Sequence, residues 1–304
     1  HNSMKKLLLL MIFSILITPI SALAQSQAAV NVSEGGYGIL KTNIGVDYEH
    51  GWGKIDDCFS ARVSYEFFRN KKFTVTANAR YTSTEVSFSA DDLSNGFDPD
   101  NIHLNGTHHF GQTGFTSTFQ SKLWGKPFMA IAMVNAEWGQ GGFARISGIA
   151  MGLLMLKASR STQFGIGPLV LINSCSRIPA FLVFMYRHKF NNKWGINLYG
   201  GIFGIDYTPT VNNLFSVGAD IDVKAFYFKP FNTSLPDKCR FTSTSFRPMA
   251  KYRRRLINNL YFDLQGGISL KMSCRANGVT GTKKYFDCNQ KVAPFIHAGI
   301  SYTM

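Results

Sequence analysis

Beyond residue 24 the sequence lacks any run of about 18 uncharged apolar residues, the length that would suggest a transmembrane helix. The nearest candidate, 146–156, is closed by Lys157 and Arg160. A bundle of transmembrane helices is therefore disfavoured, although three adjacent apolar stretches between residues 146 and 186 leave that alternative open. Acidic residues are also few, 18 against 32 basic ones, and no Cys-x-x-Cys or Cys/His spacing for zinc is present.

The segment 4–24 is predicted to be a secretory signal peptide. Two lysines precede an apolar run over 7–17, and Ala22-Leu23-Ala24 has the small-x-small pattern of a cleavage site. Residues 1–3 lie upstream of Met4 and are interpreted as upstream or added residues. The net charge is +14 for the full chain and +12 without Lys5 and Lys6. Export disfavours nucleic acid as the partner of this charge, so we expect membrane phosphates as its counter-charges.

What is abundant favours β-structure. The chain has 26 Phe, 12 Tyr and 28 Gly, a composition that suits a β-barrel. Several segments alternate apolar and polar residues, as half-buried strands do. The most regular is 214–228, with one face made of Phe215, Val217, Ala219, Ile221, Val223, Ala225 and Tyr227. Its other face carries Ser216, Gly218, Asp220, Asp222 and Lys224.

The connections predict the strand number. Short turns recur near 69–72, 123–127, 158–161, 190–193 and 257–259, whereas long polar loops are expected at 90–109, 229–242 and 275–290. Both chain ends of an outer-membrane barrel lie on the short-turn side, so the number of strands should be even. Splitting 193–208 at Gly200-Gly201 satisfies this parity. We predict a barrel over 37–304 with about 12 to 14 strands of about 9 to 11 residues, after a short segment 25–36. The stretch 243–255 is counted among these strands, although it is basic and its alternation is irregular.

The last fourteen residues alternate to the end, with one apolar face ending at Tyr302 and Met304. His297, Gly299, Tyr302 and Met304 have the spacing of the terminal signal that the bacterial barrel assembly machinery reads, except that Met stands where that signal usually has Phe or Trp. A soluble β-sandwich would bury similar faces but needs no such signal. With the signal peptide and the alternating strands, the chain resembles outer-membrane β-barrel proteins of Gram-negative bacteria of unknown function. The resemblance implies localisation in the cell outer membrane and three partners: outer-membrane lipids, lipopolysaccharide and the assembly machinery.

Few residues suggest chemistry. Cys274 and Cys288 bracket one loop and are predicted to form a disulfide, as an exported protein permits; an odd cysteine count leaves at least one thiol unpaired in a monomer. Aspartates and histidines in 90–109 lack a metal-binding spacing, so a solvated external loop is preferred. His188 and His297 are the histidines that a hydrolase site would use, but the first is read as an interface aromatic and the second as part of the terminal signal.

The sequence therefore predicts a porin-like passive channel or a structural barrel without a cofactor. A barrel enzyme acting on lipids, or an adhesin or receptor using its long loops, is the alternative. Inward-facing charges can line an open channel or pair within a filled barrel, and the sequence leaves that choice open. The candidate lumen residues are Arg62, Glu66, Arg80, Asp220, Asp222 and Lys224.

Overall fold

The computed structural model describes residues 42–172, 180–199, 202–231, 234–279 and 283–304. The expected signal peptide 4–24, the segments 1–3 and 25–36, and Cys175 lie outside the described residues. In chain order the elements are β1 (Asn43–Gly51), β2 (Ile55–Arg69), β3 (Phe73–Val86), η1 (Ala90–Asp92), η2 (Ser94–Gly96), β4 (Gly106–Leu123), β5 (Lys126–Gly139), β6 (Gly142–Ala158), β7 (Thr162–Ile172), β8 (Ala180–Lys189), β9 (Trp194–Tyr199), β10 (Ile202–Thr210), β11 (Asn213–Phe228), β12 (Cys239–Ile257), β13 (Leu260–Gly278), β14 (Lys284–Asp287) and β15 (Ala293–Thr303). Among these residues no helix is long and apolar enough to span a membrane.

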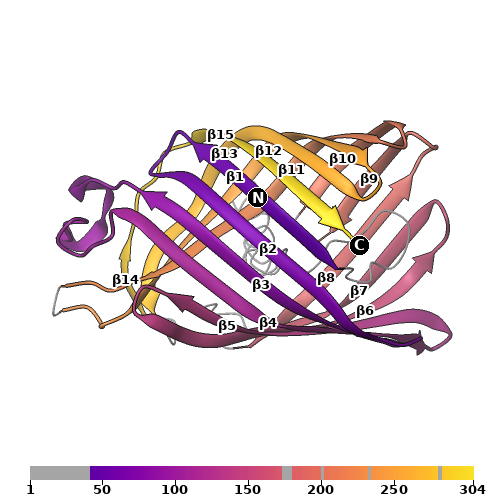
Figure 1. The fold of residues 1–304 in the computed structure, drawn as a ribbon, viewed down its shortest axis with the longest axis horizontal. Helices are drawn as coiled ribbons and strands as arrows, with labels where there is room; N and C mark the ends of the chain where they lie inside the picture. The colour runs from indigo at the N-terminus through magenta and orange to yellow at the C-terminus, as the bar shows by residue number, and fades with distance from the viewer. Residues whose placement is uncertain (1–41, 173–179, 200–201, 232–233, 280–282) are drawn as a thin grey trace, which may run out of the picture.

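The strands form one closed antiparallel barrel (Figure 1). Each strand from β1 to β13 pairs with the next, β13 pairs with β15, and β15 pairs with β1 over Asn43–Gly51. Closure leaves no unpaired sheet edge between the first and last strands. Fourteen strands make the wall, and the short β14 extends the far end of β13. The predicted barrel class is confirmed, at the upper end of the predicted strand number.

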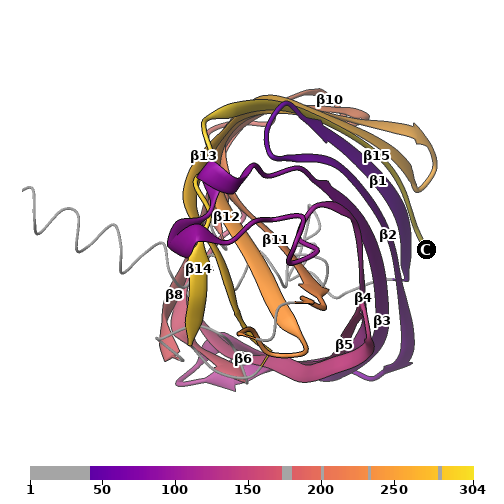
Figure 2. The same cartoon turned by 90° about the vertical axis from the view of Figure 1, so that its left-hand side faces the viewer.

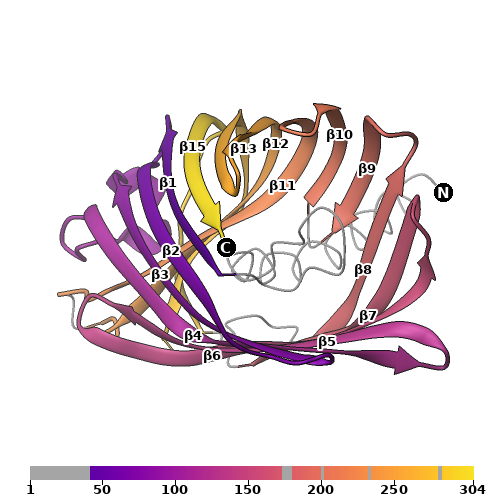
Figure 3. The same cartoon turned by 45° about the vertical axis from the view of Figure 1, so that its right-hand side comes forward.

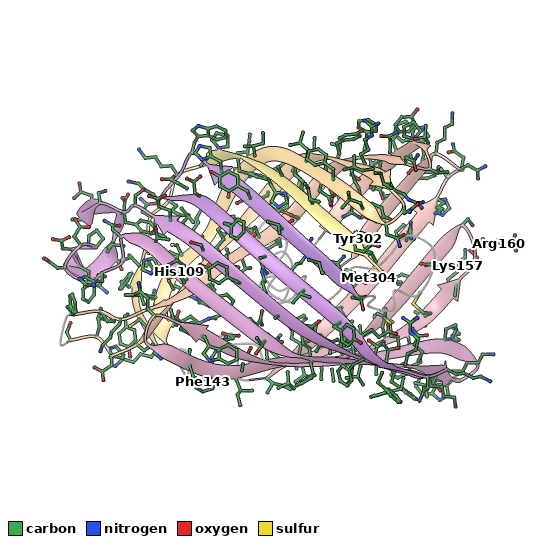
Figure 4. All side chains as sticks on the ribbon, in the orientation of Figure 1. His109, Phe143, Lys157, Arg160, Tyr302 and Met304 are labelled. Carbon is green, nitrogen blue, oxygen red and sulfur yellow. The ribbon has the colours of Figure 1, made fainter. Side chains whose placement is uncertain are left out.

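The predicted split of 193–208 is also confirmed, because β9 and β10 are separate, paired strands. At one end of the barrel, six connections of two to four residues join β2–β3, β4–β5, β6–β7, β8–β9, β10–β11 and β12–β13. We call this the turn end, and the opposite one the loop end. Figure 4 places Lys157 and Arg160 at the turn end and His109 toward the loop end. The loop end also carries short connections, at 52–54 and 140–141, so the expected pattern of short turns at one end and long loops at the other holds only in part.

The strand expected at 243–255 is confirmed, as the middle of β12, a strand of 19 residues. The expected strand length is wrong for several strands. The expected 9 to 11 residues per strand holds for β7 and β8, with 11 and 10 residues, but β4, β6 and β13 have 18, 17 and 19. The long strands extend past the low rim formed by β7 to β10. The predicted loop at 275–290 is correspondingly shorter, because β13 continues to Gly278 and β14 pairs back onto it.

The loop-end half of β11 leaves the wall. The short β10 pairs with β11 only up to Ala219, so the remainder of β11 has β12 as its single strand neighbour. In the turn-end half, Val217 is 67% exposed, as expected for an outward side chain; farther along the same face, Ile221 is 4% exposed and Tyr227 is buried. Both faces of β11 are therefore enclosed in its second half. The regular alternation of 214–228 does not continue as a lipid-facing face.

The bent half of β11 crosses the mouth of the barrel to β4 and β5. Figure 2 looks into this mouth and shows β11 running toward the side where β5 and β6 lie. Tyr227 stacks near Phe110 of β4, with 6.1 Å between ring centroids, and donates a hydrogen bond to the Glu137 carboxylate of β5. Beyond the strand, the Lys238 ammonium donates to the carbonyls of Gly141 and Phe143 at 2.9 and 2.7 Å. The β11–β12 hairpin thus crosses the loop end from the inside and docks on β4, β5 and the β5–β6 turn.

The inward bend of β11 to β13 lies at two glycines and a proline. Gly218 of β11 and Gly267 of β13 both pair with Met249 of β12, next to Pro248. A Cβ on Gly267 would overlap the Pro248 carbonyl oxygen, and one on Gly218 would overlap that of Phe203. Glycine in a strand permits this close backbone approach, and proline removes a ladder hydrogen bond. The three strands can therefore turn inward together.

Gly139 of β5 provides the docking space for the hairpin. A Cβ at this position would lie 2.5 Å from the Tyr227 Cβ, whereas one at Gly111 of β4 would meet nothing closer than 3.7 Å. Gly139→Ala should destabilise the docked hairpin by about 1–3 kcal/mol, the usual cost of overpacking. Urea unfolding in lipid vesicles and protease cleavage within 229–238 should both detect it. Gly111→Ala is the matched control, and equal behaviour of the two variants would contradict this docking.

Candidate functional site

The interior of the barrel contains a cavity of about 450 Å³ beneath the crossing hairpin. Inward-facing side chains from almost every part of the wall line it, because alternate residues of a strand point to opposite faces. Five of the six sequence-predicted lumen residues are among them: Arg62, Arg80, Asp220, Asp222 and Lys224. The sixth, Glu66, lies on the same inward face near the turn end, where it pairs with Arg69 instead.

A charged network ties the bent hairpin to β1. The Arg247 guanidinium of β12 binds both carboxylate oxygens of Asp220 at 3.0 Å, and Glu49 of β1 at 2.8 Å. Lys224 of β11 binds the other Glu49 oxygen at 2.6 Å, and Asp222 lies 3.5 Å from Arg247. Two-point contact by an arginine fixes its geometry as well as its charge. We call Glu49, Asp220, Asp222, Lys224 and Arg247 the central network.

Arg247 also stacks on an aromatic ring. Its guanidinium carbon lies 4.6 Å from the centroid of the Phe295 ring on β15. The side chain is 9% exposed, so these partners replace most of its hydration. A buried charge with one partner removed is strongly destabilising. The central network therefore holds β1, β11, β12 and β15 together inside the lumen.

A second group of polar residues explains part of the C-terminal pattern. Asp47 of β1 accepts from Arg62 at 2.9 Å and lies 3.7 Å from His297 of β15. A Cβ on Gly299 would overlap the Asp47 carboxylate. The His297 and Gly299 positions thus have a packing role in the lumen wall.

The other half of the terminal pattern faces outward. Tyr302 is 41% and Met304 is 60% exposed, and Figure 4 shows both toward the turn end. Tyr302 lies opposite Ile44 of β1 and Leu260 of β13. The assembly-signal role of His297, Gly299, Tyr302 and Met304 stays a prediction.

Opposite the charged side, the middle part of the inward face of β5 to β8 is apolar. Directly paired residues continue across these strands, as in the row Ile131, Met151, Leu169, Phe181. Figure 3 shows β5 to β8 forming one side of the barrel, opposite β10 to β13. We call this surface the apolar wall; its members are Met129, Ile131, Met133, Ile149, Met151, Leu153, Met155, Leu169, Leu171, Phe181, Val183 and Met185. Met185 is the member of this set that lines the cavity.

The mouth is filled by an apolar cluster. It joins the β3–β4 loop, the β11–β12 hairpin and the β13–β14 hairpin, and we call it the mouth cluster: Ile55, Val86, Phe88, Leu93, Ile102, Leu104, Phe226, Phe228, Leu235, Cys239, Phe241, Cys274, Ala276, Phe286 and Cys288. Phe226 stacks between His108 and Phe241, at centroid distances of 4.1 and 4.6 Å. The expectation of a solvated loop at 90–109 is wrong here, because its apolar residues Leu93, Ile102 and Leu104 are buried and 106–109 belong to β4.

Polar contacts fix this loop to its neighbours. Lys54 binds the Asp92 carboxylate of η1 at 2.8 Å, and Ser89 donates to it from both its amide and its hydroxyl. Burial alone would raise the pKa of Asp92, but the hydrogen bonds from Lys54 and Ser89 outweigh it and hold that pKa below its ordinary value. Among the described residues no group of three or more His, Cys, Asp or Glu side chains is arranged to hold a metal ion.

The predicted disulfide pair lies inside the mouth cluster. Cys274 and Cys288 are free thiols in this structure, and the Cys288 amide donates to the Cys274 carbonyl at 2.9 Å. Residues directly opposite each other in an antiparallel pair have Cα atoms about 4.5–5.5 Å apart, which a disulfide can span. Cys58 and Cys239 are also free thiols. The Cys274–Cys288 disulfide stays a prediction.

The structure reveals charged residues that the sequence interpretation missed. Arg247 lies in the stretch that was read as irregular, and Glu137 and Arg145 form a buried pair at 3.1 Å on β5 and β6. The signal for β12 was present: Arg247, Lys251 and Arg253 recur in steps of two or four residues, so they share one face of a strand. Lys251 and Arg253 line the cavity and lie 3.5 and 2.7 Å from Asp263. Because residues 253–255 are all arginine, the alternation of basic residues on one face of β12 was not recognised in the sequence.

The two histidines considered for a hydrolase site have other partners. His188 contacts the Thr162 hydroxyl at 2.8 Å and packs edge-on against Phe190. His297 lies beside Asp47 in the lumen wall. A catalytic triad needs a nucleophile, a base and an acid whose side chains form one hydrogen-bonded row. The contacts of His188 and His297 do not place either histidine in such a row.

No protein-family model matches the chain, and no curated protein matches its sequence. Among solved structures, an outer membrane channel from Pseudomonas putida F1 is similar at 9% identity and a TM-score of 0.44, covering 90% of this chain and 100% of that one. The TodX monoaromatic hydrocarbon channel follows at 12% and 0.43, covering 88% and 91%. A Salmonella typhi outer membrane phospholipase matches at 9% and 0.36, covering 93% and 98%. Likenesses this distant carry no argument about the function or the site.

Removal of Arg247 tests the central network. Arg247→Met leaves Glu49, Asp220 and Asp222 with Lys224 as their remaining close cation, so we expect a loss of about 3–5 kcal/mol in the free energy of unfolding, measured with urea in lipid vesicles. The double variant Arg247→Met/Asp220→Asn should recover part of this loss, since one unpaired charge is gone. Arg254→Met, an exposed position on the same strand, should change the stability by less than about 0.5 kcal/mol. Equal effects of Arg247→Met and Arg254→Met would refute the role of the network.

Proposed function

We propose that the protein is an integral outer-membrane barrel that acts as a channel with a closed outer mouth. One observation carries this proposal: a charged and polar cavity lies inside a closed barrel, directly beneath an apolar cluster that seals one end. A barrel packed solid with side chains would have no such cavity. A constitutively open porin would have no such seal.

The exterior supports the membrane assignment. Large apolar side chains are exposed around the wall, among them Val46 on β1, Phe115 on β4, Val134 on β5 and Val217 on β11. Soluble monomers rarely expose apolar patches of more than a few hundred Å². In lipid, a closed barrel satisfies every backbone hydrogen bond of its wall, and an apolar exterior is then favourable. The loop end would face the cell surface and the turn end the periplasm.

The alternatives fit the contacts less well. An adhesin would present its long loops to a partner, whereas the β3–β4 loop packs its apolar residues into the mouth cluster. A lipid hydrolase would need a reactive site at the membrane surface, and His188 is already held by Thr162 and Phe190. A channel uses both the cavity and the seal.

Single-channel recording in planar bilayers tests the proposal. The unmodified protein should show a low conductance with rare openings, because the mouth cluster excludes water and ions. The double variant Phe226→Ala/Phe241→Ala removes two stacked rings from the cluster and should open more often and conduct more. Phe215→Ala, an exposed position on the outer face of β11, is the control and should behave like the unmodified protein. A large steady current through the unmodified barrel, or no current through any variant, would contradict the proposal.

A further inference from the structure

The exposed charges of the barrel are divided unequally between its two ends. At the turn end, eleven exposed lysines and arginines lie within 69–72, 122–126, 157–160, 189–193 and 254–255, and we call these eleven the cationic rim. They belong to five of the six turn-end hairpins, all except β10–β11, so they are spread around the circumference of the barrel. Figure 4 shows two of them, Lys157 and Arg160, at this end.

No exposed acidic side chain lies beside the cationic rim among the described residues. The exposed acids there all lie at the loop end: Glu85, Asp91, Asp98, Asp100, Asp237 and Asp287. Exposed lysines at the loop end are fewer than these acids: Lys229, Lys283, Lys284 and Lys291. The excess of positive charge is therefore concentrated at one end of the molecule.

The acids nearest the turn end face the lumen and have other partners. Asp263 binds Arg253, and Asp206 accepts hydrogen bonds from Asn197 and Ser216. Glu66 binds Arg69, the one rim cation with a printed carboxylate partner. The remaining rim cations have no ion pair with any of the described residues. Unpaired like charges repel one another, so a negatively charged partner outside the chain would stabilise the rim.

Exposed tryptophans lie among these cations. Trp124 is 82% exposed and lies between Lys122 and Lys126, and Trp194 directly follows Lys193. Tryptophan is enriched where a membrane meets water, because its ring is apolar and its N–H is polar. Lysine and arginine can lay their apolar stems along such a surface and hold the charge in the head-group layer. This combination fits a lipid head-group layer better than it fits a soluble acidic protein.

We propose that the cationic rim is a binding surface for the head groups of phospholipids that carry a net negative charge. The sequence predicted membrane phosphates as counter-charges without placing them, and the rim gives them a location and a charge class. The proposal rests on the membrane assignment made under the proposed function. In the orientation given there, the rim meets the leaflet that faces the periplasm. The loop end should show no such preference.

The tryptophans of the chain can report on the two ends separately. Trp124 and Trp194 lie in the rim, whereas Trp52 and Trp138 lie at the loop end. Trp52→Phe/Trp138→Phe leaves the rim reporters, and Trp124→Phe/Trp194→Phe leaves the loop-end reporters. Each variant is placed in nanodiscs that mix phosphatidylcholine with phosphatidylglycerol, with bromine on the acyl chains of one lipid or of the other. Bromine quenches tryptophan fluorescence at short range, so the quenching measures which lipid adjoins each end.

The rim reporters should show phosphatidylglycerol favoured over phosphatidylcholine about fivefold or more, the effect of one cation at an anionic surface. High salt should reduce this preference, because it screens exposed charges. Replacing the four lysines that flank the reporters (Lys122, Lys126, Lys189 and Lys193) with Gln should bring the ratio close to one. The matched control replaces Lys229, Lys283, Lys284 and Lys291 with Gln; it removes the same charge from the loop end and should leave the rim ratio unchanged.

Equal quenching by the two brominated lipids at the rim, an equal phosphatidylglycerol preference at the loop end, or an unchanged ratio after the flanking lysines are replaced would each overturn the lipid assignment. These outcomes leave the channel proposal to be decided by the bilayer recordings. Absence of quenching by either lipid would overturn the membrane assignment and this proposal with it. Conversely, a barrel that shows the rim preference but never conducts would overturn the channel and keep the lipid-binding surface.

Discussion

The contacts of Arg247 are the interaction on which the interior depends. This one guanidinium joins Asp220 on the bent strand β11 to Glu49 on β1 and stacks on Phe295 of β15. It lies one residue before Pro248, where β11 to β13 turn inward. Buried ion pairs contribute little net stability compared with apolar packing, but they are geometrically demanding. The central network therefore specifies where the hairpin crosses the lumen, while the mouth cluster supplies the apolar burial.

This crossing divides the lumen into two kinds of surface. On one side lie the paired charges of β1, β11, β12 and β13; on the other lies the apolar wall of β5 to β8. In the proposed channel, opening of this mouth, rather than pore width, would control passage.

The barrel could be predicted from the sequence because alternation and parity are local properties. The split at 193–208 followed from counting connections, and the outward face of β15 from a period of two. The bend of β11 could not be predicted from the sequence. It depends on β10 being shorter than β11, which is a property of the tertiary structure and not of either strand alone. Phe226 and Phe228 replace the polar face of β11 after Lys224, which was a sign that this face changes surroundings. Likewise, the apolar stretches at 146–186 were compatible with transmembrane helices. The strands of the apolar wall are apolar on both faces, so their sequences lack the alternation that identifies a strand.

The central claim is that the β11–β12 hairpin docks across the mouth onto the β5–β6 turn. Pulsed electron paramagnetic resonance can test this with spin-labelled noncanonical residues placed in pairs, at Asp237 and Gln140 and at Asp237 and Ala180. The Lys238 contacts to Gly141 and Phe143 predict a short, narrow distance distribution for the first pair. The second pair should be clearly longer, because Ala180 begins β8 on the low rim. A distance from Asp237 to Ala180 shorter than that to Gln140 would mean that the hairpin stands in the wall, and the account of a closed mouth would fail.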